Sequence, residues 1–582
     1  MAIRVWNAEA AVVTSPNRFR MLFTDRVQHW VLLAIPLCLL LLLERNFWGF
    51  IQDDAFISFR YARNLVEGEG LVFNPGEWVE GYSNFLWTLL MAIPIGLGLD
   101  PVPFSSGLGL LLSLGCLACC HAMARLFLAD RGLAVQLLPS ALLASSTSFS
   151  LWAVSGMELA LFTLLVLAGS YLFLRDLGEG APNRRGMALS GLLLGLASLT
   201  RPEGPVFIVL MVPTMLLGGQ RRDQRLRCVL AFCLSAAAIL LPYYAWRLAY
   251  YGHLVPNTYY VKAAGGMYAI QHGLSYLKKL LVFNHNGVLM GLALIGVLSG
   301  RNKPAKVFAF GSVLAFTSYM VKIGGDILPM YRLYAPCLPF LYLLAAAGAA
   351  SVVDMVDSVI SKAGAAGAVS HDTGQQVRGA AIWSVTAGCI FVALSNFSTG
   401  LGHSEYGGVL KALERSHIAV GRLLDDIHVP GDKAIAQDMG AVPYYAGNVR
   451  FVDVIGLTDR RVAREMYDVG YTPYVRYLMW GDPAARQRID QVDDRLKEYL
   501  LSLDCRYIIF NVHMPGVDRD AVLGAIDRKD ATFFQPHIAA NTFYHNLGSD
   551  SRFIEGYRLR RGWPYSLVYY LLLYERVPHP PS

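Results

Sequence analysis

DDAFISFRYARNLVEGEGLVFNPGEWVEGYSNFLWT, residues 53–88, follows the first apolar run of the chain, His29–Leu43. Two adjacent carboxylates, Asp53 and Asp54, therefore stand at a predicted boundary between membrane and water. Ionisable groups at such a place are costly and commonly mark function. The rest of the stretch is too polar to cross a bilayer and too aromatic for a simple linker. The combination indicates a membrane-embedded enzyme that works where lipid meets water.

The composition indicates an integral membrane protein. The 582 residues are 54% hydrophobic and 16% charged, whereas soluble domains carry roughly 25% charged residues. The net charge of +7 gives no sign of nucleic-acid binding, because the basic residues cluster in short loops, as the topology of membrane proteins requires. Nine cysteines form no recognisable disulfide framework.

Apolar runs of membrane length recur along the first 400 residues. After the first run they fall near 84–98, 103–127, 133–150, 156–175, 185–199, 203–218, 226–246, 286–299, 305–322, 334–352 and 379–397. A basic N-terminal tail and three basic loops (175–187, 219–227 and 300–306) predict the cytoplasmic side. Residues 47–83 and 151–158 then both face outside, so one segment between 84 and 150 must be re-entrant or wrongly divided. We predict about eleven transmembrane helices and an external C-terminus.

The chain divides into two predicted domains. Residues 1–397 form the transmembrane domain, with a first extracytoplasmic loop at 47–83. Residues 398–582 form a soluble extracytoplasmic α/β domain, because strand-like runs alternate there with amphipathic helical stretches. The predicted strands are Lys433–Gln437, Phe451–Ile455, Tyr507–Val512 and Ser566–Tyr574.

A helix lying in the membrane interface is predicted over residues 55–66. Its apolar residues recur at helical spacing: Phe56, Phe59, Ala62 and Val66. Such a helix would roof a lateral opening to the bilayer and hold Asp53 and Asp54 beneath it. Three nearby aromatic residues fit an interfacial belt: Trp78, Tyr82 and Trp87.

The unusual charges of the apolar segments collect at their outer ends. Besides the aspartate pair they are Glu158, Arg201, Lys262, Asp326 and Arg332. Each has an ordinary structural explanation. Aspartate can cap the following helix, Arg201 can snorkel to the interface, Glu158 can favour a helix dipole, Lys262 can be solvated, and Asp326 can belong to a turn. Their convergence on one side of the membrane favours a shared site.

This set of groups suits one kind of chemistry. A carboxylate can take a proton from a hydroxyl acceptor, and arginine or lysine can stabilise a departing phosphate. Nucleotide-activated sugars are cytoplasmic, so an outward-facing site would need a donor from the membrane. A polyprenyl-phosphate sugar meets that need.

Several motifs, in order along the chain, resemble the GT-C superfamily of membrane glycosyltransferases. DDAFISFRYARN, EGYSNFLWTLL, SGME, RPEG, PNTYYVK and GGDILPMYR look most like the terminal arabinofuranosyltransferases of mycobacterial cell-wall synthesis. The stretch from Asp438-Met439-Gly440 through residues 451–459 (FVDVIGLTD) also resembles that group. The resemblance implies a GT-C core in the bacterial inner membrane, with the active site and the C-terminal domain facing the periplasm or the outside.

By this resemblance the donor is decaprenyl-phospho-arabinofuranose or a similar lipid-phosphate sugar, and the acceptor is an extracytoplasmic glycan or protein. The base is assigned to Asp53, with Asp54 next, because the sequence does not separate them. Glu158, Arg201, Lys262, Asp326 and Arg332 are assigned to donor or phosphate binding, and no acceptor-binding residue is assigned. Chemistry without a metal comes first, because no His/Cys cluster has ligand spacing; a divalent cation held by carboxylates stays open.

Other functions compete with this one. Within the superfamily, the transferred sugar could be mannose or another hexose, and the acceptor could be a protein. A lipid or solute transporter would place ionisable residues and broken helices near the bilayer midplane, often in repeated halves; this chain shows neither pattern. A structural scaffold would leave the one-sided charges unexplained.

Overall fold

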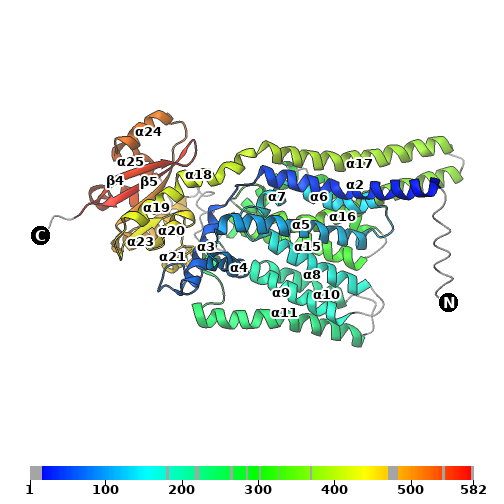
Figure 1. Ribbon diagram of the computed structural model, residues 1–582, viewed down its shortest axis with the longest axis horizontal. Helices are drawn as coiled ribbons and strands as arrows, with labels where there is room; N and C mark the ends of the chain where they lie inside the picture. Colours follow the sequence, from blue (N-terminus) through cyan, green and yellow to red (C-terminus); the bar gives the residue numbers. More distant parts are fainter. Residues whose placement is uncertain are drawn as a thin grey trace.

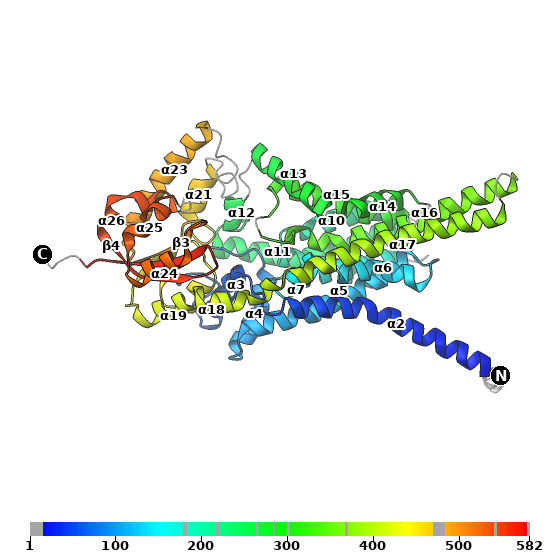
Figure 2. The same ribbon diagram turned by 90° about the horizontal axis from the view of Figure 1, so that it is seen from above.

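The computed structural model of the protein has a helical part and an α/β part at opposite ends of its long axis (Figures 1 and 2). It describes residues 16–178, 183–216, 222–262, 266–283, 286–299, 303–326, 328–366, 370–468, 483–540 and 544–578. The first described residues lie at the far end of the helical part, and the last lie beside the sheet.

The helical part is a bundle of apolar helices. They are α2 (Pro16–Asn46), α5 (Pro101–Phe127), α6 (Leu133–Ala144), α7 (Thr147–Ala153), α8 (Leu159–Gly178), α9 (Arg184–Thr200), α10 (Gly204–Leu216), α11 (Arg222–Tyr251), α13 (Gly266–Phe283), α14 (Asn286–Leu298), α15 (Lys303–Ile323), α16 (Leu338–Ala365) and α17 (His371–Gly402). Shorter elements at the end nearest the sheet are α3 (Asp53–Val66), α4 (Phe85–Gly96), α12 (Asn257–Lys262) and the 3₁₀ helix η1 (Arg332–Cys337).

Within the described residues, six helices are long and apolar enough to cross a membrane, and up to eight if each of two bent helix pairs counts as one span. This makes the chain a membrane protein, while the total of about eleven stays a prediction. Two features bear on the surplus segment predicted between 84 and 150. Helix α4 has 12 residues and is about 18 Å long, short of the ~30 Å hydrocarbon core. Helices α6 and α7 are bent by 60° at their break.

The α/β part contains a five-stranded mixed sheet in the described residues, in the order β2-β1-β3-β5-β4. The strands are β1 (Lys433–Ala436), β2 (Arg450–Asp453), β3 (Tyr507–His513), β4 (Tyr557–Pro564) and β5 (Tyr569–Arg576). The helices are α18 (Val409–Arg415), α19 (His417–Ile427), α20 (Ala441–Tyr445), α21 (Arg460–Asp468), α23 (Pro483–Ser502), α24 (Arg519–Asp527), α25 (Ala531–Ala539) and α26 (Ser551–Gly556), with η2 (Ser404–Gly408) and η4 (Leu547–Ser549) as 3₁₀ turns.

Strand β1 pairs in parallel with β2 and β3, whereas β5 pairs antiparallel with β3 and β4. The two parallel pairs need crossovers, which explains the alternation of strands and helices in the sequence. The four predicted strands are present, and β4 is an additional one. The predicted domain boundary falls inside α17, since that helix ends at Gly402.

Helix α3 lies between the two parts (Figure 2). Most of its residues are buried, including the charged Arg60. The helix exists as predicted, but the α/β part covers the face that was expected to meet lipid and water. The predicted aromatic belt is wrong for Tyr82 and Trp87, which are buried, whereas Trp78 is 47% exposed.

Candidate active site

A cavity of about 460 Å³ opens at the end of the bundle nearest the α/β part. This volume is typical of small-molecule sites. Segments far apart in the sequence form its wall: α3 and the loop after it, the turn before α8, the α9–α10 turn, the C-terminal ends of α11 and α15, and η1. Five of the seven predicted site residues line it: Asp54, Glu158, Arg201, Asp326 and Arg332.

Short turns with special backbone requirements place these side chains at the helix ends. Gly156 has a φ of +79° in the turn before Glu158, a conformation that favours glycine. Pro202 disfavours helical backbone at Arg201, so α9 ends at Thr200 and Arg201 adopts an extended conformation there. Gly324 and Gly325 both have positive φ just before Asp326.

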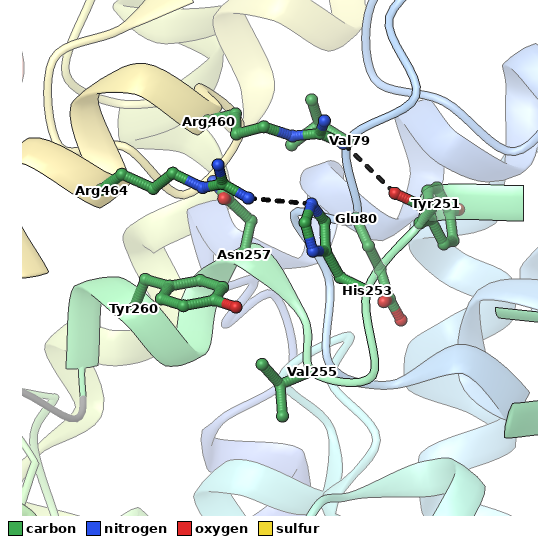
Figure 3. A pocket seen from close by; sticks show the side chains of 9 residues that line it. All are labelled: Val79, Glu80, Tyr251, His253, Val255, Asn257, Tyr260, Arg460 and Arg464. Carbon is green, nitrogen blue, oxygen red and sulfur yellow. Dashed lines mark hydrogen bonds between the residues drawn. The ribbon is translucent and has the colours of Figure 1, made fainter. Parts of the chain in front are cut away.

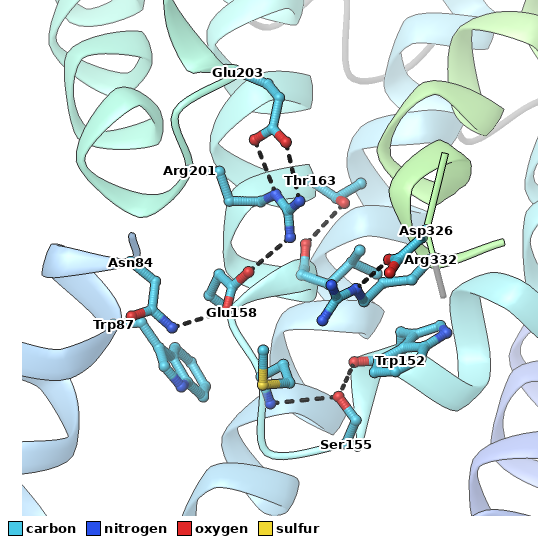
Figure 4. A network of polar contacts seen from close by, with 12 residues as sticks. Asn84, Trp87, Trp152, Ser155, Glu158, Thr163, Arg201, Glu203, Asp326 and Arg332 are labelled. Atoms are coloured by element: carbon cyan, nitrogen blue, oxygen red, sulfur yellow. Dashed lines mark hydrogen bonds and ion pairs between the residues drawn. The ribbon is translucent and has the colours of Figure 1, made fainter. Parts of the chain in front are cut away.

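Arg201 is bracketed by two carboxylates (Figure 4). Its Nη1 donates to Glu158 Oε1 at 2.7 Å, while its Nε and Nη2 donate to the two oxygens of Glu203 at 3.2 and 3.1 Å. Asn84 donates to the other oxygen of Glu158 at 2.9 Å. All three charged side chains are at least nine-tenths buried. Three of the five N–H groups of Arg201 therefore already donate to acidic partners.

Arg332 and Arg247 are held differently. Arg332 Nε donates to Asp326 Oδ2 at 2.9 Å, and its guanidinium lies 5.1 Å from the centre of the Trp152 ring. Arg247 Nε donates to Glu80 Oε2 at 2.6 Å. Among the described residues, neither arginine uses its Nη groups in a hydrogen bond. Both arginines line the cavity, so these donors are placed to meet an anion.

The two adjacent aspartates point to different places. Asp54 lines the cavity. The Asp53 carboxylate instead accepts hydrogen bonds from the backbone N–H groups of Gly440 (3.0 Å) and Ala441 (2.8 Å) in the α/β part. Successive residues of a helix are about 100° apart around its axis, so one aspartate faces each side of α3. Only Asp54 is positioned to meet a ligand in the cavity.

The α/β part also reaches the cavity, through Leu457. The loop that carries Leu457 is held by hydrogen bonds from both parts of the chain. Asp453 accepts from the N–H groups of Ile455 and Thr458, each at 2.8 Å, and the side chain of Asn257 donates to the Gly456 carbonyl at 2.7 Å. The site is therefore built by both parts of the chain.

Comparison with known proteins adds to this geometry. A protein-family model described as a domain of unknown function (DUF8728) matches residues 409–548. The chain is 29% identical over 236 residues to a terminal β-(1→2)-arabinofuranosyltransferase of Mycobacterium tuberculosis, covering 38% of this chain and 36% of that protein. It is 26% identical over 337 residues to the Corynebacterium glutamicum enzyme of the same name, covering 50% and 48%. The chain thus matches less than half the length of either relative.

Among solved structures, the archaeal oligosaccharyltransferase of Archaeoglobus fulgidus, in complex with an inhibitory peptide and a dolichol-phosphate, aligns with a TM-score of 0.52. The sequence identity is 11%, and the alignment covers 83% of this chain and 69% of that one. The chain has the GT-C glycosyltransferase fold. The resemblance carried by the sequence motifs is thereby confirmed.

The GT-C fold brings into the site one charged residue that the sequence reasoning missed, Arg247, which is paired with Glu80. Arg247 stands near the C-terminal end of α11 among tyrosines and a tryptophan, directly after the apolar segment predicted at 226–246. A charge at the outer end of an apolar helix was the criterion for the other site residues, so it would also have found Arg247. Lys262 ends α12, but its side chain lies outside the described residues.

A second, smaller pocket lies where α21 meets the α11–α12 loop and the first loop of the GT-C core (Figure 3). Arg464 donates to His253 at 3.0 Å, and Arg460 donates to the Trp78 carbonyl at 2.9 Å. Its volume of about 10 Å³ holds about one water molecule. These residues join the two parts of the chain, and the pocket has no room for a sugar.

Proposed function

We propose that this protein is a membrane glycosyltransferase that moves a sugar, arabinofuranose, from a polyprenyl-phosphate donor to an extracytoplasmic acceptor glycan. The observation that carries the proposal is the cavity at the end of the bundle, where one carboxylate, Asp54, shares the wall with two partly engaged guanidiniums, Arg247 and Arg332. The arabinofuranosyltransferase relatives support the choice of sugar. The dolichol-phosphate bound to the fold relative supports a lipid-phosphate donor.

In the proposed reaction Asp54 takes the proton of an acceptor hydroxyl. The acceptor oxygen forms a bond to the anomeric carbon of the donor, and the bond between that carbon and the phosphate oxygen breaks. Polyprenyl phosphate leaves with one additional negative charge. The Nη groups of Arg247 and Arg332 would stabilise that charge, because charge-assisted hydrogen bonds are strong in a site shielded from water.

Arg201 has a different role in this proposal. Three of its five N–H groups donate to Glu158 and Glu203, so we assign it to ordering the cavity wall and not to binding the phosphate. Glu158 and Asp326 are likewise partners of arginines and act on the donor through them. We keep Lys262 as a further candidate for donor binding.

We propose that transfer does not depend on a divalent cation. Three of the cavity carboxylates, Glu158, Glu203 and Asp326, already accept hydrogen bonds from arginines, so a metal ion would have to displace a guanidinium. Treatment with EDTA should change turnover by less than about twofold. A loss that added Mg²⁺ or Mn²⁺ restores would contradict this and assign a cation to the cavity.

The cavity is proposed to face away from the cytoplasm. Glu158 precedes α8 and Arg201 follows α9, so the other ends of these helices, which border the basic loop 175–187, lie about 30 Å away. Basic loops stay on the cytoplasmic side. A reporter inserted at Gly364 should be cytoplasmic, and one fused after Ser582 should be extracytoplasmic. The reverse result would remove access to an extracytoplasmic acceptor.

The experiment that tests the function is a transfer assay with purified protein. Decaprenyl-phospho-arabinofuranose and decaprenyl-phospho-mannose are offered in parallel with an arabinan acceptor and with a peptide acceptor. Transfer of arabinofuranose to the glycan, abolished in Asp54→Asn, would support the proposal. Transfer of mannose alone, or to the peptide alone, would keep the enzyme class but replace the donor or the acceptor.

A further inference from the structure

Three charged side chains of α3 are fastened to one short segment of the α/β part, residues 440–449. Asp53 accepts from the N–H groups of Gly440 and Ala441. Arg60 donates to the carbonyls of Pro443 and Val449. We call these contacts, together with those of Arg63, the α3 clasp.

The arginines of the clasp bind backbone groups. Arg60 is 2% exposed, and its Nε also donates to the Phe73 carbonyl at 2.8 Å. Arg63 donates to the Tyr444 carbonyl at 2.6 Å, and its guanidinium lies 3.7 Å from the centre of the Tyr444 ring. Removing such a buried group would leave several carbonyls without a donor, which costs stability. The fold therefore fixes the position of α3 firmly.

Close approach at Gly440 is what allows Asp53 to reach the α/β part. A Cβ at Gly440 would collide with the backbone oxygen and the carboxylate of Asp53. By contrast, a Cβ at Gly447 in the same segment would meet only the Arg63 guanidinium, at an ordinary distance of 3.6 Å. Gly440 therefore has no room for a side chain, whereas Gly447 in the same segment has room for one.

The clasp acts next to the candidate base. Asp53 precedes Asp54 in the first turn of α3. The hydrogen bonds that hold Asp53 therefore also fix the backbone of Asp54. A displacement of about 1 Å of a reacting group can cost about 10²-fold in rate. We propose that Asp53 is a positioning residue, through which the α/β part holds Asp54 at the reacting atoms. This inference rests on the proposed function, since it needs Asp54 as the base.

Single-turnover transfer, with enzyme in saturating excess over donor, tests this inference. A misfolded fraction of enzyme leaves the rate constant unchanged under this condition, whereas a misplaced base lowers it. Gly440→Ala and Asp53→Asn should each lower the rate constant by about 10- to 100-fold. Gly447→Ala is the matched control and should stay within about twofold of the wild type.

The outcomes separate the inference from the proposed function. If Gly440→Ala and Asp53→Asn keep the wild-type rate constant while Asp54→Asn is inactive, the positioning role is wrong and the base assignment stands. If Asp54→Asn keeps its activity, the proposed function itself fails. Should Gly440→Ala or Asp53→Asn not fold, Arg63→Gln is a milder variant. It should lower the rate constant by about threefold, and an unchanged value would overturn the inference.

Discussion

The two faces of α3 use charge in different ways. On the cavity side, Asp54 shares the wall with guanidiniums that are paired with carboxylates of other segments. On the α/β side, Asp53, Arg60 and Arg63 bind backbone groups. An incoming anion can compete with a carboxylate for a guanidinium, because both are acceptors of the same kind. Backbone partners are fixed by the fold, so the second face suits positioning and the first suits exchange of ligands.

The largest effect is expected on the cavity side, from Asp54→Asn. The amide keeps the shape of the carboxylate but is no base, so turnover should fall by roughly 10²- to 10⁴-fold. The measurement is steady-state transfer from the lipid-phosphate sugar, with a melting curve to show an intact fold. Asp53→Asn should lose less than Asp54→Asn. The opposite order would make Asp53 the base and reverse the comparison of the two faces.

The arginines of the cavity should divide into two classes. Arg332→Lys and Arg247→Lys each remove a planar guanidinium from the cavity wall, and lysine cannot form the bidentate contact with phosphate that arginine forms. Each should raise the KM for the donor about tenfold, equivalent to about 1.4 kcal/mol.

Arg201→Lys is the matched control for these two variants. It breaks a buried arrangement of one cation between two carboxylates. Compared with the other two variants, it should therefore lower the Tm more and raise the donor KM less. Equal effects of all three substitutions on the donor KM would mean that the number of carboxylate partners does not decide which arginine binds the donor.

Much of the cavity wall was predictable from the sequence for a physical reason. A charge beside an apolar segment is costly unless it has a partner or a function. That rule alone found Glu158, Arg201, Asp326 and Arg332 on separate segments, and the structure gathers them around one cavity. It could not show that Arg201 pairs with two carboxylates and Arg332 with one among the described residues, because pairing depends on side-chain positions that spacing does not encode.

The α3 clasp could not be predicted from the sequence, for a different reason. Helical spacing predicted α3 and an apolar face for it, but which face the α/β part covers depends on docking between segments 388 residues apart in the chain. Asp53 and Asp54 are identical in type and adjacent, so only the docked structure separates them. Strand β4 was missed because its arginines, such as Arg558 and Arg561, obscure the strand pattern.

The smallest effect should appear on the α/β face, as a dependence of stability on pH. Desolvation, only partly offset by the charge of His417, raises the pKa of the Asp53 carboxyl from 3.8 to about 6 in the folded protein. His417 Nε2 lies 2.9 Å from Asp438; burial alone would lower the pKa of His417, but this contact and the charges of Asp53 and Asp438 raise it.

Because the folded pKa of Asp53 is the higher one, its contribution to stability is complete below about pH 3.8 and is lost as the pH rises through about 6. The asparagine side chain of the Asp53→Asn variant would stay neutral throughout, while His417 and Asp438 are common to both proteins. The Tm of the wild type minus that of Asp53→Asn should therefore fall by a few degrees between pH 4 and pH 7, at about 1 °C per kcal/mol for a chain of 582 residues. A constant difference would show that Asp53 ionises in the clasp as it does in water, and a difference that grows with pH would show that the clasp lowers the pKa of Asp53.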